Sequence, residues 1–144
     1  MSLPEIVVAE VEEGRALLDE ALQQTAQLSY CDSCEQALRL LGSDGISGLI
    51  VGLHFDGSRM FELLNTVRTQ TAYRKIPVLC IRLLATRFPS GLVESARIAC
   101  RSVGVPFFDY LETSKLEGQT DAKALLRKAA IEALGIKKKS ARLN

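Results

Sequence analysis

Short apolar segments alternate with amphipathic ones along the whole chain, and this alternation constrains the fold more than any other feature of the sequence. The apolar segments have the length of strands, and the segments between them carry apolar residues at helical spacing. Strands that alternate with helices form a parallel sheet with right-handed crossovers and helices on both faces. The predicted strands are 5–11, 26–30, 46–53, 75–84 and 105–111, and the predicted helices are 12–24, 34–42, 57–70, 92–104 and 122–135.

The third predicted strand, ISGLIVGL (46–53), is a continuous apolar run, as is typical of a central strand that is covered on both faces. It ends near Gly52, and the carboxyl ends of parallel strands are where proteins of this layout place their functional groups. Glycine brings no side chain to that position. The sequence therefore predicts a central strand that lacks a reactive group at its functional end.

Polar residues mark where two of the helices are expected to begin. Asp32 or Ser33 is predicted to cap helix 34–42, and Thr120 or Asp121 is predicted to cap helix 122–135. Spacing also predicts which side chains of the last helix face the core: Ala122, Leu125, Leu126, Ala129 and Ala133.

Length and composition favour a single soluble domain over residues 5–135, followed by a basic tail over 136–144. A net charge of +1 gives no preference for nucleic acid or an anionic membrane. No apolar run approaches the roughly 20 residues that span a bilayer. The N-terminus also lacks the pattern of a signal peptide, so we expect a cytoplasmic protein.

The cysteines leave two interpretations open. Cys31 and Cys34 form a CxxC motif, whereas Cys80 and Cys100 are isolated. A zinc site needs a second such motif or spaced histidines, and the sequence has one histidine, His54, so no metal is expected. Reduced, buried thiols are the simpler expectation. A redox role for the CxxC pair is the alternative, because the motif lies where a strand passes into a helix N-terminus, which lowers a thiol pKa.

Three segments carry a resemblance to a known family. SGLIVGLHFDGSRMFELLNTVR is similar to the third strand, loop and third helix of response regulator receiver domains, and IPVLCIRLLA and GVPFFDYLE are similar to their fourth and fifth strands. The resemblance covers roughly Glu5 to Leu134. It implies a single flavodoxin-like (CheY-like) α/β domain with five helices and a five-stranded parallel sheet in the order 2-1-3-4-5.

The resemblance also implies a chemistry, namely phosphoryl transfer from a histidine kinase to an aspartate at the end of the third strand. In a working receiver, acidic residues after the first strand hold Mg²⁺. A hydroxyl after the fourth strand and a lysine after the fifth bind the phosphoryl oxygens and relay the switch. These four functions can be compared with this sequence position by position.

Three of the four functions are missing or replaced. Aligned through FELL, the acceptor position falls on Gly52, and Arg82 takes the place of the hydroxyl. The lysine position falls on Leu111 or Thr113, depending on the register. Two acidic residues of AEVEE supply negative charge where the acidic pair is expected. The degenerate pocket is therefore predicted to comprise Gly52, Glu10, Glu12, Arg82 and Thr113.

Two hypotheses follow for neighbouring residues. Arg82 is predicted to pair with Glu10 and Glu12 in place of the absent metal and phosphoryl group, or else to point into solvent. Asp56 lies four residues beyond the acceptor position, and we expect a turn residue there, because a loop carboxylate would miss the geometry that the reaction requires.

Other functional classes have weaker support. GLHFDG resembles the cobalamin-binding DxHxxG motif, but His54 follows the third predicted strand and Gly52 replaces the leading aspartate. A flavin-type site would need a phosphate loop after the first strand, where the sequence is acidic. No GxGxxG, P-loop or Ser-His-Asp set is present, so no enzyme activity and no cofactor are expected.

The remaining expectation is a pseudo-receiver, a signal-transduction domain of the two-component phosphorelay type that acts through protein–protein interaction without phosphorylation on aspartate. The resemblance implies a histidine kinase, an effector domain or a second copy as partner. A homodimer would use the face formed by 92–104, 105–111 and 122–135. Phe107, Phe108 and Tyr110 alternate in this region, and any of them that stays exposed is a candidate anchor.

Overall fold

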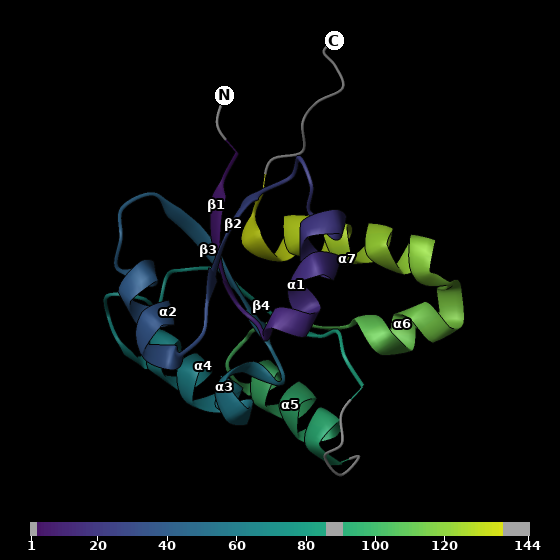
Figure 1. Cartoon of the computed structure of the whole chain (residues 1–144). Helices are drawn as coiled ribbons and strands as arrows, with labels where there is room; N and C mark the ends of the chain where they lie inside the picture. Colours follow the sequence, from purple (N-terminus) through teal and green to yellow (C-terminus); the bar gives the residue numbers. More distant parts are fainter. Residues whose placement is uncertain (1–2, 86–90, 137–144) are drawn as a thin grey trace.

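The computed structural model describes residues 3–85 and 91–136, and its centre is a parallel sheet (Figure 1). The sheet order is β2-β1-β3-β4-β5, and every pair of neighbouring strands is parallel. This confirms the predicted sheet and its strand order. The strands are β1 (Glu5–Ala9), β2 (Gln27–Cys31), β3 (Ile46–Gly52), β4 (Val78–Arg82) and β5 (Phe107–Asp109).

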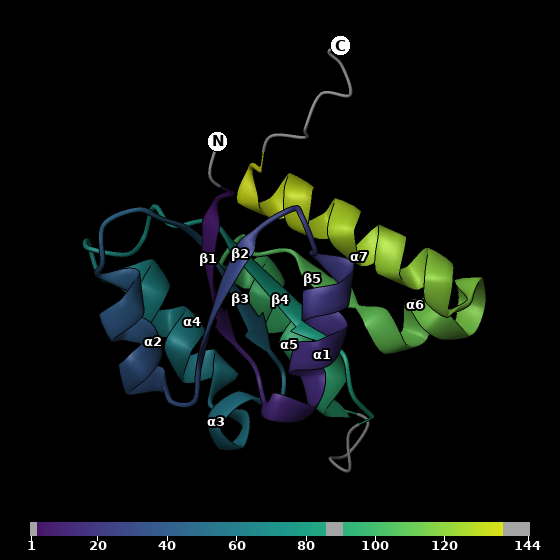
Figure 2. The same cartoon turned by 45° about the horizontal axis from the view of Figure 1, so that its top comes forward.

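Helices cover both faces of the sheet, as Figures 1 and 2 show from two directions. The core consists of two clusters, one on each face of the sheet. Residues of β1 contribute to the two clusters in turn, because successive side chains of a strand point to opposite faces. Ile6 and Val8 pack with α1 (Glu12–Ala21) and α7 (Gln119–Leu134). Val7 and Ala9 pack with the helices of the other face, which are α2 (Cys34–Leu41), α4 (Met60–Thr69) and α5 (Gly91–Ser102).

The described residues contain seven helices rather than the five predicted. One addition is α3 (Phe55–Ser58), a short turn in which Asp56, Gly57 and Ser58 all have positive φ. The helix predicted over 57–70 consequently begins only at Met60. Left-handed conformations interrupt a right-handed helix, so the chain has to turn here before α4 can start.

The other addition is α6 (Tyr110–Glu117), which replaces the end of the last predicted strand. β5 stops at Asp109 because the Asp109 side chain accepts a hydrogen bond from the Glu112 N–H and so caps α6. A break at Gly118, with φ 86°, then separates α6 from α7. The predicted start of the last helix was therefore wrong, since α7 begins at Gln119 without a side-chain cap.

The face predicted for the last helix was partly correct. Ala122 and Leu126 are fully buried, whereas Leu125 is 37% exposed. Ala130 and Leu134 complete the buried side of α7. Ser33 caps α2 as expected, by accepting a hydrogen bond from the Gln36 N–H. Of the predicted basic tail, residues 137–144 lie outside the described residues.

No helix within the described ranges 3–85 and 91–136 combines the length and the apolarity needed to cross a bilayer.

Candidate functional site at the carboxyl edge of the sheet

Four residues lie at the carboxyl edge of the sheet because each follows or ends a parallel strand. Glu10 comes directly after β1, and Gly52 ends β3. Arg82 and Asp109 end β4 and β5 and are paired in the sheet register. The chain order of the strands reverses between β1 and β3, the position where sheets of this kind most often bind ligands. This edge is therefore the candidate site.

Gly52 leaves room that the side chain of Glu10 fills. A Cβ atom at position 52 would lie 2.3 Å from the Cδ and from both carboxyl oxygens of Glu10. A second glycine completes the enclosure, because a Cβ atom at Gly14 would lie 2.9 Å from the Glu10 Cγ. The carboxyl group of Glu10 thus occupies the space that any side chain at position 52 would need.

Glu10 is a buried acid, with only 1% of the residue exposed. Its Oε1 accepts a hydrogen bond of 2.8 Å from the Val11 N–H. Burial raises the pKa of Glu10 to about 7, although the Val11 N–H and the charge of Arg15 act in the opposite direction. Glu13 adds a smaller upward effect. Near neutral pH a substantial fraction of this carboxyl group is consequently protonated.

The edge does not fit a divalent cation. Mg²⁺ prefers ionised carboxylates and other oxygen ligands in an open octahedral arrangement. Glu10 is turned inward against glycine, and Glu12 is exposed in the first turn of α1. Among the residues that the structure describes, no group of three or more histidine, cysteine or acidic side chains is placed to hold a metal ion. The side chains at this edge therefore do not support a reaction step that depends on Mg²⁺.

The pairing predicted for Arg82 is wrong. The Arg82 Nε donates to Asp109 Oδ1 at 2.9 Å, so the arginine bridges β4 and β5 and does not join the two glutamates after β1. Solvent exposure is not the alternative either, because only 16% of the Arg82 side chain is exposed. Arg82 instead pairs with Asp109, the carboxylate at the end of the neighbouring strand.

Asp109 lies in the candidate site at the carboxyl edge, and the sequence did not lead us to predict it there. Its side chain is 4% exposed and accepts hydrogen bonds from Arg82, from Arg97 of α5 at 3.2 Å and from the Glu112 N–H at 3.1 Å. The capping pattern of Asp109 and Glu112, three residues apart in DYLE, is the signal that could have identified a helix start here. Asp109 therefore connects β4, α5 and α6.

At the position that corresponds to the lysine of a working receiver, the structure has a helix and not a strand end. Leu111 and Thr113 both lie in α6 rather than at the end of a strand. The Thr113 hydroxyl donates to the Asp109 backbone oxygen at 2.8 Å. The side chain at the end of β5 is instead a carboxylate, Asp109.

His54 and Asp56, two titratable residues that follow Gly52, contact different groups. Asp56 Oδ2 accepts from the Cys34 N–H at 2.9 Å and from the Arg59 guanidinium at 3.1 Å, and these contacts lower its pKa. Asp56 therefore joins the turn after β3 to the start of α2. The pKa of His54 is lowered by burial and by the nearby charge of Arg82.

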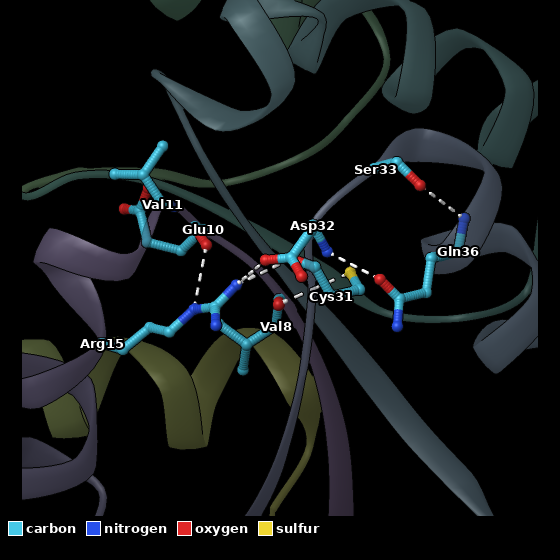
Figure 3. Close-up of polar contacts among 8 residues, drawn as sticks. All are labelled: Val8, Glu10, Val11, Arg15, Cys31, Asp32, Ser33 and Gln36. Carbon is cyan, nitrogen blue, oxygen red and sulfur yellow. Dashed lines mark hydrogen bonds and ion pairs between the residues drawn. The ribbon is translucent and has the colours of Figure 1, made fainter.

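A second polar network joins β1, α1 and β2 next to Glu10 (Figure 3). The Arg15 Nε donates to the Glu10 backbone oxygen at 3.3 Å. Its Nη2 donates to the Cys31 carbonyl and, at 2.6 Å, to Asp32 Oδ1. Arg15 also lies over the Tyr30 ring, 5.0 Å from its centroid. Arg15 thus lies between the β1 and β2 ends of the edge.

All four cysteines are buried and none forms a disulfide, as the simpler expectation required. The Cys31 Sγ donates to the Val8 carbonyl at 3.6 Å. Burial raises the pKa of Cys31 to about 12 and that of Cys34 to about 11. Cys34 does begin a helix, but burial and Asp56 raise its pKa although the charge of Arg59 acts in the opposite direction. Neither thiol is activated as a nucleophile, since the thiolate is the reactive form.

The three aromatic residues of the predicted interaction face are placed differently from one another. Phe107 and Phe108 are half-buried and belong to the cores on opposite sides of the sheet. The Arg97 guanidinium lies 5.3 Å from the centroid of the Phe107 ring. Tyr110 is 7% exposed and begins α6, so it does not continue the alternation of the strand.

No protein-family model and no curated protein sequence matches the chain. Solved structures do match. A response regulator of red light signalling in R. palustris has a TM-score of 0.67 and 15% identity, over 94% of this chain and 97% of that chain. The phosphorylated cyanobacterial phytochrome response regulator RcpA has a TM-score of 0.67 and 12% identity, over 92% of this chain and 95% of that chain. The chemotaxis response regulator CheY4 of Vibrio cholerae has a TM-score of 0.56 and 16% identity, over 75% of this chain and 85% of that chain.

These likenesses extend over nearly the full length of the first two regulators. They agree with the observed strand order and with helices on both faces of the sheet. At this level of identity the agreement concerns architecture. The chain has the CheY-like fold of response regulator receiver domains.

Proposed function

We propose that this chain is a pseudo-receiver, a signal-transduction domain of the two-component type that is not phosphorylated on aspartate and acts through contacts with other proteins. The observation that carries the proposal is the contact between Gly52 and Glu10. The acceptor position has no carboxylate, and the carboxyl group of Glu10 lies 2.3 Å from where a Cβ at position 52 would be, so it fills the space that an acceptor side chain would enter.

Neighbouring carboxyl groups are poor substitutes for the missing acceptor. Asp56 is held by the Cys34 N–H and by Arg59, on the side of α2. Glu10 is buried and has a pKa of about 7. A nucleophile has to be ionised and within reach of its reaction partner. Neither residue is therefore a phosphoryl acceptor under this proposal.

Arg82, Asp109 and Arg97 form a fixed ionic bridge where a working receiver would bind phosphoryl oxygens. Asp109 accepts from both arginines, one from β4 and one from α5. Buried pairs of this kind are costly to break, because removing one partner leaves an uncompensated charge. The bridge thus supports a β4–β5 end of the edge that keeps one arrangement without a phosphoryl group.

The test is exposure of the protein to acetyl phosphate, and separately to beryllofluoride, with Mg²⁺ present. We expect no added mass in intact-protein mass spectrometry and no shift of the Gly52 amide resonance. A receiver domain that retains its acceptor aspartate serves as the positive control under the same conditions. An acyl phosphate on any carboxylate of this chain would refute the proposal.

The candidate surface for protein contacts lies on α5, β5 and α7. Ile98 of α5 is 56% exposed and Leu125 of α7 is 37% exposed. Phe107 of β5 is half-buried next to Arg97. Exposed aliphatic and aromatic side chains can anchor a partner at low entropic cost. We include a second copy of the chain among the partners of this surface.

Sedimentation velocity over a range of protein concentrations tests whether a second copy of the chain binds to this surface. We expect association that weakens when Ile98 is replaced by glutamate. The matched control is Leu116→Glu, which changes a 75% exposed leucine of α6 outside this surface. Equal effects of the two substitutions, or a monomer at every concentration, would exclude a homodimer through this surface.

A further inference from the structure

Glu10 lies between two environments, an enclosure beside two glycines, which it occupies in the structure, and the guanidinium of Arg15, whose charge already lowers the pKa of the Glu10 carboxyl group. In the first environment the side chain is enclosed by Gly14 and Gly52, and Leu83 lies against the same space, 3.1 Å from where a Cβ of Gly14 would be. Two glycines and a leucine thus lie around the side chain, and the Val11 N–H donates to Oε1. An apolar enclosure suits a neutral carboxyl group and penalises an ionised one.

The second environment is the guanidinium of Arg15, which lies beside Glu10 and reaches toward Asp32 (Figure 3). Arg15 already contacts the Glu10 backbone oxygen and pairs with Asp32 at 2.6 Å. The Asp32 side chain is 82% exposed, so water screens its attraction for Arg15. A negatively charged Glu10 would therefore compete with Asp32 for the same arginine.

We propose that Glu10 is a proton-operated switch of this domain: the neutral side chain packs over Gly52, and the ionised side chain leaves this position for Arg15, in competition with Asp32. Loss of one proton thereby changes the contacts at the ends of both β1 and β2. Val11 is the N-cap residue of α1 and its N–H donates to Glu10 Oε1, so the move breaks a hydrogen bond at the start of α1. The inference goes beyond partner binding and does not depend on the absence of phosphorylation.

The charged surroundings place this transition close to neutral pH. The pKa of Glu10 is raised to about 7, chiefly by burial. In the described part of the chain, α1 contributes an attractive cation and a repulsive anion, β3 contributes a glycine, and a leucine follows β4. Further along the edge, a histidine lies close enough to an arginine for the arginine's charge to lower the histidine pKa. These groups are Arg15, Glu13, Gly52, Leu83, His54 and Arg82. Because the pKa of His54 is lowered from its ordinary value, titration above about pH 6.5 reports on Glu10 rather than on His54.

The experiment is an NMR titration of the full chain from about pH 6.5 to 9, in which the amide resonances of Gly14, Gly52 and Asp32 are followed. We expect all three to shift together with a midpoint near 7. Glu10→Gln, which has the same shape but cannot ionise, should remove the transition. Glu12→Gln changes an exposed glutamate two residues away and should leave the transition in place.

Two results would overturn the proposal. One is a Gly52 amide that does not move across this range, and the other is a transition that persists in Glu10→Gln. A shift of Gly52 without a shift of Asp32 would refute the transfer to Arg15. If Glu10→Gln fails to fold, the side-chain carboxyl carbon of Glu10 in the unaltered protein, followed by NMR from about pH 3 to 9, decides the question. A midpoint near the ordinary glutamate value would then exclude the switch.

Discussion

At position 52 a single methyl group would be enough to displace Glu10. The Gly52 backbone is not left-handed, so the cost of adding a Cβ comes from the contact with Glu10 and not from the conformation of the chain. We expect Gly52→Ala to lower the free energy of unfolding by roughly 1 kcal/mol, at the low end for overpacking, because the atoms that must shift are the far end of the flexible Glu10 side chain. In a Glu10→Ala background the same substitution should cost much less.

Urea unfolding of the two single variants and the double variant measures this coupling. Gly42→Ala is the control, because a Cβ there would lie 3.5 Å from its nearest neighbour and φ is −78°. Strictly additive effects of Glu10→Ala and Gly52→Ala would contradict the account in which Glu10 fills the space at position 52.

At the scale of elements, Asp109 connects β4, α5, β5 and α6 through three hydrogen bonds to one buried carboxylate. Asp109→Ala would leave Arg82 and Arg97 without this partner and α6 without its cap. We expect a loss of roughly 2–4 kcal/mol in the free energy of unfolding. Amide hydrogen exchange in 110–117 should also accelerate, because α6 depends on the cap.

Asp44→Asn is the control for Asp109→Ala, since Asp44 is exposed. Asp109→Asn should fall between the two, because an asparagine side chain can still accept a hydrogen bond from the Glu112 N–H but has no charge for the arginines. An Asp109→Ala variant as stable as Asp44→Asn would contradict the bridging role of Asp109.

For the whole molecule, the buried acid predicts how stability depends on pH. The pKa of Glu10 is about 7 in the folded chain against 4.5 in its ordinary state. The folded state therefore binds more protons than the unfolded state between these values, and stability falls as pH rises from 4.5 to 7. The contribution of Glu10 to this fall is at most about 3 kcal/mol, at 1.36 kcal/mol per pH unit.

Chemical denaturation at several pH values from about 4.5 to 8 measures this dependence for the whole chain. In Glu10→Gln the fall attributable to Glu10 should disappear, whereas Glu12→Gln should retain it. A pH profile that is the same in Glu10→Gln and the unaltered protein would contradict the buried, proton-binding state of Glu10.

The sequence by itself determined the sheet, its strand order and the absence of a side chain at position 52. The sheet and the empty position follow from local patterns, namely apolar runs of strand length, helical spacing between them and the identity of one residue, whereas the strand order was implied by the resemblance to receiver domains. Ser33 as a cap and Gly135 as the end of the last helix were also predictable, because each acts within a few residues of its own position.

Only the tertiary structure decided which charged groups meet at the carboxyl edge. Arg82 and Asp109 are distant in the chain but adjacent in the sheet, and Glu10 turns inward because two glycines, Gly14 and Gly52, approach from different elements. Side-chain pairing across strands depends on where each strand ends. Here a helix cap at Asp109 ended β5 earlier than its apolar pattern suggested, and placed a carboxylate beside Arg82.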